Sequence, residues 1–259
     1  MRGARFGQHF LNAPWVAREL VKNAALHPSE TVVEVGPGKG ALTKQLLAHG
    51  AHVVAIEKDP ILVSTLQKTF KMEITEGKLK VVEGDIRDIT PEKLGLDSYA
   101  VAANIPYYIT GEIIKHFLTA QKQPRAIALL IQKEVAERII ARDGKESILS
   151  LSVKAYGTPS IVARVPRSCF NPPPRVDSAI LLIENVSRNF FKDVSEEAFF
   201  NVIRAGFASK RKFLANNLKK VMKNPEALLA TCDLPQKSRA EDVLLEKWKC
   251  LTRQLKVTG

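Results

Sequence analysis

Four short stretches of the chain combine glycine and polar residues in a way that suits a nucleoside-containing ligand. EVGPGKG (34–40) has three glycines where an apolar run gives way to a helical pattern, and such a loop lets a ligand approach the backbone closely. Glu57 stands 21 residues after Gly36, where a carboxylate can accept hydrogen bonds from ribose hydroxyls. Asp85 can accept one from an adenine amino group, and NIPYYITG (104–111) supplies an amide, a rigid ring and two phenols.

The glycine loop by itself is equally typical of a plain turn between a strand and a helix. It also lacks the G-K-[ST] ending of a phosphate-binding loop. Ligands of open α/β sheets bind at the carboxyl ends of strands, and four successive expected strand ends carry these residues. We therefore expect a binding site. A nicotinamide-dependent dehydrogenase would use the same loop and ribose-binding acid, but it would not need the Asn-Pro-Tyr corner at 104–107.

The elements that must position these residues are short apolar runs that alternate with helical patterns through the first 185 residues. Runs rich in Val, Ile and Ala are typical of strands covered on both faces. Strands are predicted at 31–36, 52–57, 79–84, 98–103, 126–131, 160–165 and 178–184, and helices near 41–49, 60–70, 110–120 and 133–142. This alternation predicts a doubly wound α/β domain with a mostly parallel seven-stranded sheet.

The chain changes character after Glu184. Helical periodicity continues to the end without a strand-like run, and Ser195 with the acids that follow it is a plausible helix start. We therefore predict two domains, an α/β domain over 1–185 and a small all-helical domain over 186–259.

Positive charge is concentrated in that second domain. The net charge of the chain is +12, and residues 186–259 hold 15 Lys and Arg against 8 Asp and Glu. Residues 204–223 contain seven basic side chains and no acidic one. A basic run is often only a solvated helix face, but such faces usually mix signs, so we favour a nucleic-acid surface. The residues expected to bind RNA are Arg204, Lys210, Arg211, Lys212, Lys219 and Lys220.

The cysteines and the apolar runs indicate the compartment. Cys169, Cys232 and Cys250 show no C-x-x-C spacing, so we expect no disulfide, no zinc site and a reducing environment, which favours the cytoplasm. Apolar runs are too short to span a membrane, and no apolar segment follows Arg2 and Arg5 as it would in a secretory signal.

Six motifs in order resemble one family. They are FGQHFLN (6–12), EVGPGKGALT, AIEKD, EGDIRD, NIPYYIT and CFNPPPRVDS (169–178), and together they resemble the ribosomal RNA adenine dimethyltransferases. The resemblance covers nearly the whole chain. It implies a class I methyltransferase fold, S-adenosylmethionine (SAM) as cofactor and a monomer. It also implies methylation of two adjacent adenosines near the 3′ end of small-subunit rRNA to N6,N6-dimethyladenosine, in an immature 30S-type particle during ribosome biogenesis.

The resemblance also assigns cofactor contacts. The N-terminal motif would close over the cofactor, the glycine loop would approach its methionine part, Glu57 would hold the ribose, and Asp85 would hold the adenine. The residues expected at the cofactor are Gln8, His9, Leu11, Gly36, Gly38, Glu57, Lys58, Asp85, Ile86 and Asn104.

The chemistry of adenine N6 explains why such a site would use Asn-Ile-Pro-Tyr. The N6 lone pair is delocalised into the ring, and accepting both N6 hydrogens out of the ring plane would oppose this. The side chain of Asn104 and the carbonyl of Ile105 are suited to that role, while Pro106 fixes the backbone without an N–H. Tyr107 would stack on the base, worth roughly 1–3 kcal/mol, and by the family pattern Phe170 would cover the other face. We name no general base, because methyl transfer depends mainly on positioning.

Three further features concern side-chain packing and RNA docking. We expect Tyr108 to pack in the core at the strand end. The family often has a glycine-containing turn before the helix near 148–156, where this chain has RDGKESILSLS (142–152). The commonly arginine-rich tail motif is SKRKFLANN (209–217) here. Both departures concern RNA docking rather than the reaction.

Two alternative functions remain open. The homologous resistance-type methyltransferases of large-subunit rRNA share the NIPY-type corner, although GPGKGALT and PRVDS favour the small-subunit group. A non-catalytic ribosome-assembly factor on the same fold is the second, against which the presence of Glu57, Asp85, Asn104 and Tyr107 argues. A DNA adenine methyltransferase is disfavoured because the sequence shows no separate module for reading DNA.

Overall fold

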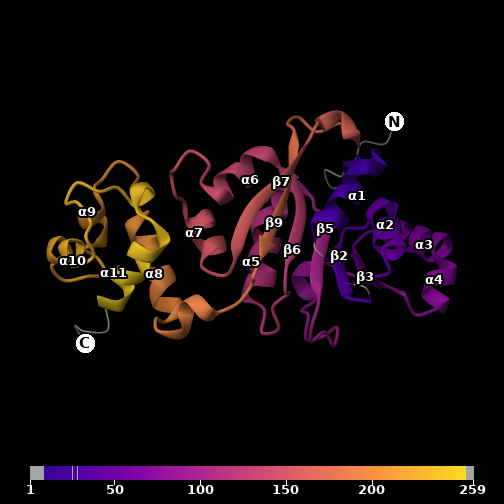
Figure 1. The fold of residues 1–259 in the computed structure, drawn as a ribbon, viewed down its shortest axis with the longest axis horizontal. Helices are drawn as coiled ribbons and strands as arrows, with labels where there is room; N and C mark the ends of the chain where they lie inside the picture. Colours follow the sequence, from indigo (N-terminus) through magenta and orange to yellow (C-terminus); the bar gives the residue numbers. More distant parts are fainter. Residues whose placement is uncertain (1–8, 25, 28, 255–259) are drawn as a thin grey trace. The chain divides into compact units, whose positions relative to one another are not determined.

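The computed structural model describes residues 9–24, 26–27 and 29–254, and the chain divides into two compact units (Figure 1). The sheet unit comprises residues 1–136 and 158–186, and the helical unit comprises 137–157 and 187–259. The second junction lies one residue from the predicted boundary at 185, but the helical unit also takes a segment from the middle of the chain. Leu151 in that segment explains this, because it belongs to the same buried cluster as Trp248.

The sheet unit is built on the predicted seven-stranded sheet, with strand order β4-β3-β2-β5-β6-β9-β7. The strands are β2 (Thr31–Val35), β3 (His52–Glu57), β4 (Leu79–Glu83), β5 (Ala100–Asn104), β6 (Ile127–Gln132), β7 (Thr158–Val165) and β9 (Ser178–Glu184). Strands β2 to β6 run parallel, and β9 is antiparallel to both of its neighbours. The doubly wound, mostly parallel fold is therefore confirmed. The strand order reverses between β2 and β5, which is where open α/β sheets bind ligands.

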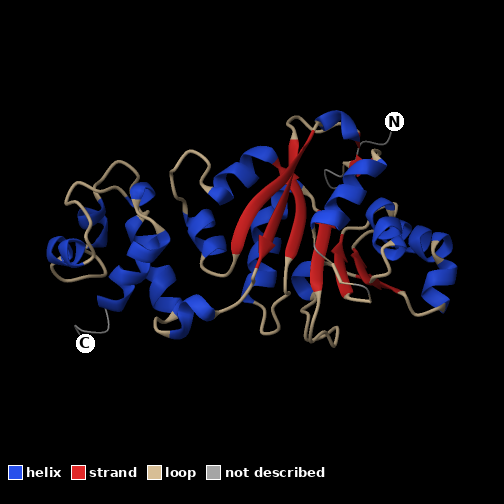
Figure 2. Ribbon diagram, viewed as in Figure 1, coloured by secondary structure: helices blue, strands red, loops and turns tan. Residues whose placement is uncertain are grey.

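Helices flank this sheet (Figure 2). They are α1 (Pro14–Asn23), α2 (Ala41–Ala48), α3 (Pro60–Thr69), α4 (Lys71–Thr75) and α5 (Thr110–Thr119), while α6 (Lys133–Ile140) begins in the sheet unit and ends in the helical unit. Successive residues of a strand point to opposite faces, and Val32 and Val33 of β2 are both fully buried, as are Val101 and Ala102 of β5. Both faces are thus covered, which explains why the strands lack polar alternation.

A second, two-stranded sheet joins distant parts of the sheet unit. β1 (Phe10–Leu11) pairs antiparallel with β8 (Phe170–Asn171), and the Asn12 N–H donates to the Cys169 carbonyl at 3.0 Å. Neither strand was predicted, because two residues are too few to show a periodicity. The pairing fixes residues 10–12 against the loop that precedes β9.

The helical unit contains α7 (Ile148–Lys154), α8 (Glu196–Gly206), α9 (Leu214–Leu218), α10 (Pro225–Thr231) and α11 (Leu245–Gln254). Ser195 caps α8 as predicted, with its hydroxyl accepting from the Ala198 N–H at 3.3 Å. Trp248 is fully buried, and its indole N–H donates to the Val243 carbonyl at 3.0 Å. None of the described helices is long and apolar enough to cross a membrane.

The helical unit also contains a disulfide, so the expectation that the chain has none is wrong, and the cysteines no longer indicate a reducing environment. Cys232 and Cys250 are bonded across 18 residues of sequence. Cys232 follows the last residue of α10 and Cys250 lies in α11, so the two sulfurs meet only because these helices are in contact. Cys169 is a buried free thiol.

Candidate active site

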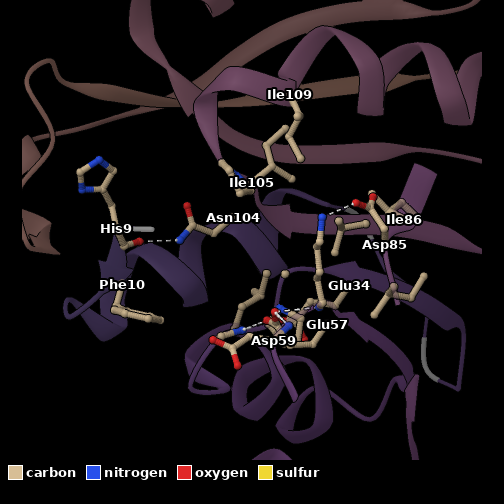
Figure 3. Close-up of a pocket in the computed structure, with 18 of the residues that line it drawn as sticks. His9, Phe10, Glu34, Glu57, Asp59, Asp85, Ile86, Asn104, Ile105 and Ile109 are labelled. Carbon is tan, nitrogen blue, oxygen red and sulfur yellow. Dashed lines mark hydrogen bonds and ion pairs between the residues drawn. The ribbon is translucent and has the colours of Figure 1, made fainter. Parts of the chain in front are cut away.

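A pocket lies at the carboxyl ends of β2, β3, β4 and β5, in the sheet unit (Figure 3). Most of the residues expected to contact cofactor or base line it: His9, Leu11, Gly36, Gly38, Glu57, Lys58, Asp85, Ile86, Asn104, Ile105, Pro106 and Tyr107. Gln8 lies outside the described residues. Phe170 is not among the lining residues.

The glycine loop between β2 and α2 forms one wall of the pocket. Gly36 and Gly38 have φ values of +66° and +60°, a region that side chains other than glycine rarely adopt. A Cβ on Gly38 would also lie 3.2 Å from the ring of Phe10. The Gly38 N–H donates to Oε2 of Glu57 at 3.1 Å, which ties the loop to the end of β3.

Glu57 is buried at 4% exposure, and its carboxylate accepts hydrogen bonds from several backbone N–H groups. Besides Gly38, its carboxylate accepts from the N–H groups of Lys58 at 2.9 Å and Asp59 at 3.0 Å, both on Oε1. A carboxylate has about four acceptor positions, so roughly one remains, on Oε2. The side chain thus shapes the loop and keeps capacity for one further donor.

Asp85 follows β4 and is surrounded by cations. Its carboxylate accepts from Lys58 Nζ at 2.9 Å and from Arg87 at 3.0 Å (Nε) and 2.6 Å (Nη2), as well as from the Arg87 N–H at 3.1 Å. The Arg87 guanidinium, with help from Lys58, holds the pKa of Asp85 well below its ordinary value. Its acceptor positions are all in use, so a further donor has to displace one of these partners, and Lys58 is the more exposed of the two.

Glu34 lines the pocket and was not identified from the sequence. It lies inside β2, is 1% exposed, and accepts a 2.6 Å hydrogen bond from the Thr43 hydroxyl. Burial raises the pKa of this carboxyl to about 8, against the lowering effect of the Thr43 hydrogen bonds. A glutamate within the mostly apolar run TVVEVG could have indicated a functional residue. It was missed because it lies inside a predicted strand and not at its end.

Asn104 ends β5 and is held in a defined orientation. Its Nδ2 donates to the backbone carbonyl of His9 at 3.3 Å, and because a carbonyl can only accept, the amide nitrogen must face His9. The amide oxygen is then directed away from His9 (Figure 3). The His9 ring is fixed in turn by a 2.7 Å hydrogen bond from Nδ1 to the Pro172 carbonyl.

Tyr107 and Tyr108 lie in a 3-10 turn (Tyr107–Ile109) and differ in environment. Tyr107 is half-buried, hydrogen-bonded to the Ser178 hydroxyl at 2.6 Å and stacked near His9 with ring centroids 5.7 Å apart. Burial raises its pKa, so the phenol stays neutral at ordinary pH. Tyr108 is 68% exposed and lines the pocket, so the expected core packing is wrong. Neighbours in a 3-10 turn point about 120° apart, so the two rings face different surroundings.

Phe170 does not reach the pocket in this structure. It is 2% exposed and belongs to the core cluster that includes Val165 and Ile180. Its place in β8, opposite Leu11 of β1, holds it there. A role on the second face of the base stays a prediction.

The residues expected to bind RNA all lie in the helical unit and are exposed: Arg204, Lys210, Arg211, Lys212, Lys219 and Lys220. Arg204 lies in α8 and donates to the Asn201 side chain. Lys219 pairs with Glu226 at 3.1 Å.

Comparison with known proteins agrees with the pocket. The family model for ribosomal RNA adenine dimethylase matches residues 3–255. The chain is 40% identical over 251 residues to "Ribosomal RNA small subunit methyltransferase A" of Dehalococcoides mccartyi strain CBDB1, covering 95% of this chain and 85% of that protein. It is 37% identical over 261 residues to the protein of the same name from Thermosynechococcus vestitus, with 97% and 96% covered.

Two solved structures share the whole fold. A dimethyladenosine transferase from Plasmodium falciparum superposes with a TM-score of 0.81 at 27% identity, covering 96% of this chain and 98% of that one. The 23S rRNA methyltransferase ErmE superposes with a TM-score of 0.78 at 25% identity, covering 95% and 99%. With the family model spanning almost every residue and relatives near 40% identity, the chain belongs to the ribosomal RNA adenine dimethylase family.

Proposed function

We propose that this protein transfers methyl groups from SAM to N6 of two adjacent adenosines near the 3′ end of small-subunit rRNA, giving N6,N6-dimethyladenosine. One observation carries the proposal, which is that four strand ends contribute to a single pocket. The glycine loop follows β2, Glu57 ends β3, Asp85 follows β4, and the Asn104–Tyr107 corner lies at the end of β5. The family and its relatives supply the substrate class.

The pocket residues fit the cofactor. Gly36 and Gly38 line the pocket with positive φ and bring no side chain into it. The remaining acceptor position of Glu57 suits one ribose hydroxyl, and Ile86 offers an apolar surface for a base. Asp85 accepts the adenine amino group after Lys58 moves aside. When bound, SAM supplies an electrophilic methyl group on a sulfonium.

The Asn104–Tyr107 corner positions the adenine. Asn104, with its nitrogen engaged by His9, presents Oδ1 as an acceptor for one N6 hydrogen, and the Ile105 carbonyl accepts the other. These two acceptors favour a tetrahedral N6 whose lone pair is available. The Tyr107 ring, fixed through its hydroxyl to Ser178, stacks on the base. Positioning of this kind accounts for most of the rate, and the neutral phenol of Tyr107 takes no proton.

The RNA itself is held by the helical unit in this proposal. The six exposed basic residues between 204 and 220 contact phosphates, and a single-stranded or flipped adenosine reaches the pocket. The proposal places the protein as a cytoplasmic monomer that acts on an immature 30S-type particle during small-subunit biogenesis. The net charge of +12 supports a polyanionic partner.

The experiment that tests this function follows labelled methyl groups. The protein and methyl-labelled SAM are incubated with small subunits that lack the modification and, separately, with bare large-subunit rRNA. The nucleosides are then separated by chromatography. Dimethyladenosine in the small-subunit sample alone is the expected result. Label in large-subunit rRNA would instead assign the resistance-type activity, and an unlabelled result with SAM binding retained would favour an assembly factor.

A further inference from the structure

The loop that joins α8 to α9 in the helical unit (Figure 1) ends at an exposed aromatic residue, Phe213. Every other phenylalanine among the described residues is buried or half-buried, whereas Phe213 is 40% exposed. Phe207, at the start of the same loop, packs against the core cluster of this unit, and Phe213 is not among the described residues that do. Phe213 therefore presents apolar surface to solvent.

Hydrogen bonds hold this loop in a defined conformation. The Asn217 side chain donates to two carbonyls near its start, including that of Ser209 at 3.0 Å. Directly after Phe213, the Leu214 N–H donates to the Ser238 carbonyl at 2.8 Å, and Leu214 is fully buried. Because these contacts fix both ends of the loop, a ligand that binds Phe213 has little backbone left to order.

Three cations immediately precede Phe213. Lys210, Arg211 and Lys212 are exposed, and none of them forms an ion pair with an acidic side chain within the part of the chain that the structure describes. Their Cα atoms lie no more than about 11 Å from that of Phe213, because consecutive Cα atoms are about 3.8 Å apart. No acidic residue occurs in 204–223. The loop thus combines an aromatic surface with strong positive charge.

The charge, rather than the exposure, sets Phe213 apart. Single exposed apolar residues are common on protein surfaces and are not by themselves evidence of a site. Leu244 of the same unit is 64% exposed, but it lies within three residues of Glu241, Asp242 and Glu246 in the sequence. A polyanion is repelled by such a neighbourhood and attracted by that of Phe213.

Proteins that bind single-stranded RNA combine a positively charged surface with aromatic side chains on which unpaired bases stack. We infer that Phe213 stacks on an unpaired base of the RNA, while Lys210, Arg211 and Lys212 contact the phosphates on either side of that base. Stacking uses the flat face that every base has, so the site accepts all four bases. The inference deepens the proposed function, because it rests on that function for RNA as the ligand.

An acidic peptide is the other ligand that suits this charge. Peptides are commonly bound by an exposed sheet edge or by an apolar groove, and a single ring in a loop supplies neither. A nucleobase needs only one flat partner, which Phe213 provides. The observations therefore favour RNA, and the peptide becomes one outcome of the test.

The test compares two labelled RNAs of eight nucleotides by fluorescence anisotropy, with the full chain. One is oligouridylate. In the other, tetrahydrofuran spacers replace the four central nucleosides, so that both RNAs carry the same phosphates. Adenosine is omitted because the pocket of the sheet unit is proposed to accept it. We expect the RNA with all of its bases to bind at least about fivefold more tightly.

Variants locate the preference for bases. Phe213→Leu keeps an apolar side chain without the ring, so it should bind both RNAs equally and leave the slope of log K against log salt unchanged. Phe213→Trp keeps an aromatic surface and should retain the preference. Leu244→Ala is the matched control and should leave both affinities unchanged. Circular dichroism melts check that each variant is folded.

Specific results would overturn the inference. Equal binding of the two RNAs by the unaltered protein would exclude stacking, and a preference that survives in Phe213→Leu would place it elsewhere. Loss of the preference in Phe213→Trp would show that the aromatic ring is not what matters. Polyglutamate that displaces oligouridylate at the same concentration of charge would assign an acidic peptide. Because no methyl transfer is measured, the methylation assay decides the proposed function separately.

Discussion

The side-chain nitrogen of Asn104 donates to the backbone carbonyl of His9 across 95 residues of sequence, at 3.3 Å. The contact joins the end of β5 to the N-terminal segment that β1 anchors. It also decides which way the amide faces, since the opposite orientation would set two oxygens against each other. The N-terminal segment therefore orients the acceptor that the proposed reaction needs.

The first prediction concerns Asn104. Asn104→Ala should reduce methyl transfer by at least about 100-fold, because the base is no longer positioned. Asn104→Asp keeps an acceptor but loses the donor to His9, so it should be nearly as inactive. Single-turnover transfer is measured beside RNA affinity, which should change little. A parallel loss of RNA binding, or an active Asp variant, would contradict the role given to this residue.

Glu34 predicts a pH dependence of stability. Its pKa in the folded protein is raised to about 8 from 4.5, so the folded state binds the proton more tightly than the unfolded state does. The stabilisation is complete below the unfolded pKa and is lost as pH rises to about 8, by up to about 1.4 kcal/mol per pH unit.

Urea unfolding measured at several pH values within that window checks this prediction. Glu34→Gln cannot ionise, so its free energy of unfolding should change less between about pH 5 and pH 8 than that of the unaltered protein. Identical slopes in the two proteins would show that Glu34 ionises normally.

The basic segment predicts a change in salt dependence. Replacing Lys210, Arg211 and Lys212 with Gln should weaken RNA binding and lower the slope of log K against log salt by about 0.7 for each lost contact with single-stranded RNA. Affinities are measured across a salt series. The matched control replaces three exposed lysines of the sheet unit, Lys68, Lys71 and Lys80. An equal effect of both triple variants would mean that only net charge matters.

Two glycines make opposite predictions for stability. A Cβ at Gly206 would overlap the buried ring of Trp248 and come within 3.0 Å of Leu214, so Gly206→Ala should cost about 1–3 kcal/mol. Gly111 in α5 has nothing within 4 Å of a built Cβ. Gly111→Ala should therefore be neutral or stabilise by up to about 1 kcal/mol. Chemical denaturation distinguishes them, and equal effects would exclude the packing explanation.

Sequence patterns predicted the large sheet because each of its strands is an apolar run long enough to recognise. They also predicted the residues at the strand ends, because parallel strands bring their carboxyl ends to one edge. Other features depend on tertiary contacts that no local pattern carries. The partners of the Cys232–Cys250 disulfide meet through helix packing, and Phe170 is buried because β8 pairs with β1.

The same limit applies inside the sites. Glu34 looked like a strand residue, and only the fold shows it beside Thr43 at the pocket. Tyr108 follows Tyr107 directly in a 3-10 turn, where neighbouring side chains point in different directions, and its side chain is therefore exposed. Glu146 lies in a loop, and its carboxylate becomes buried only when the helical unit has assembled.

The pairing of β1 with β8 has a consequence for the order of events during translation. Phe10 and Asn171 are partners, so one side of the pocket cannot form until the ribosome has extruded more than 170 residues. Strands β2 to β6 need only residues up to 132 and can pair earlier. Contacts this distant in sequence are slow to close, because the intervening chain must first lose its freedom. The cofactor pocket of a nascent chain therefore stays incomplete through most of its synthesis. The chain can become able to transfer methyl groups only after β8 has been made.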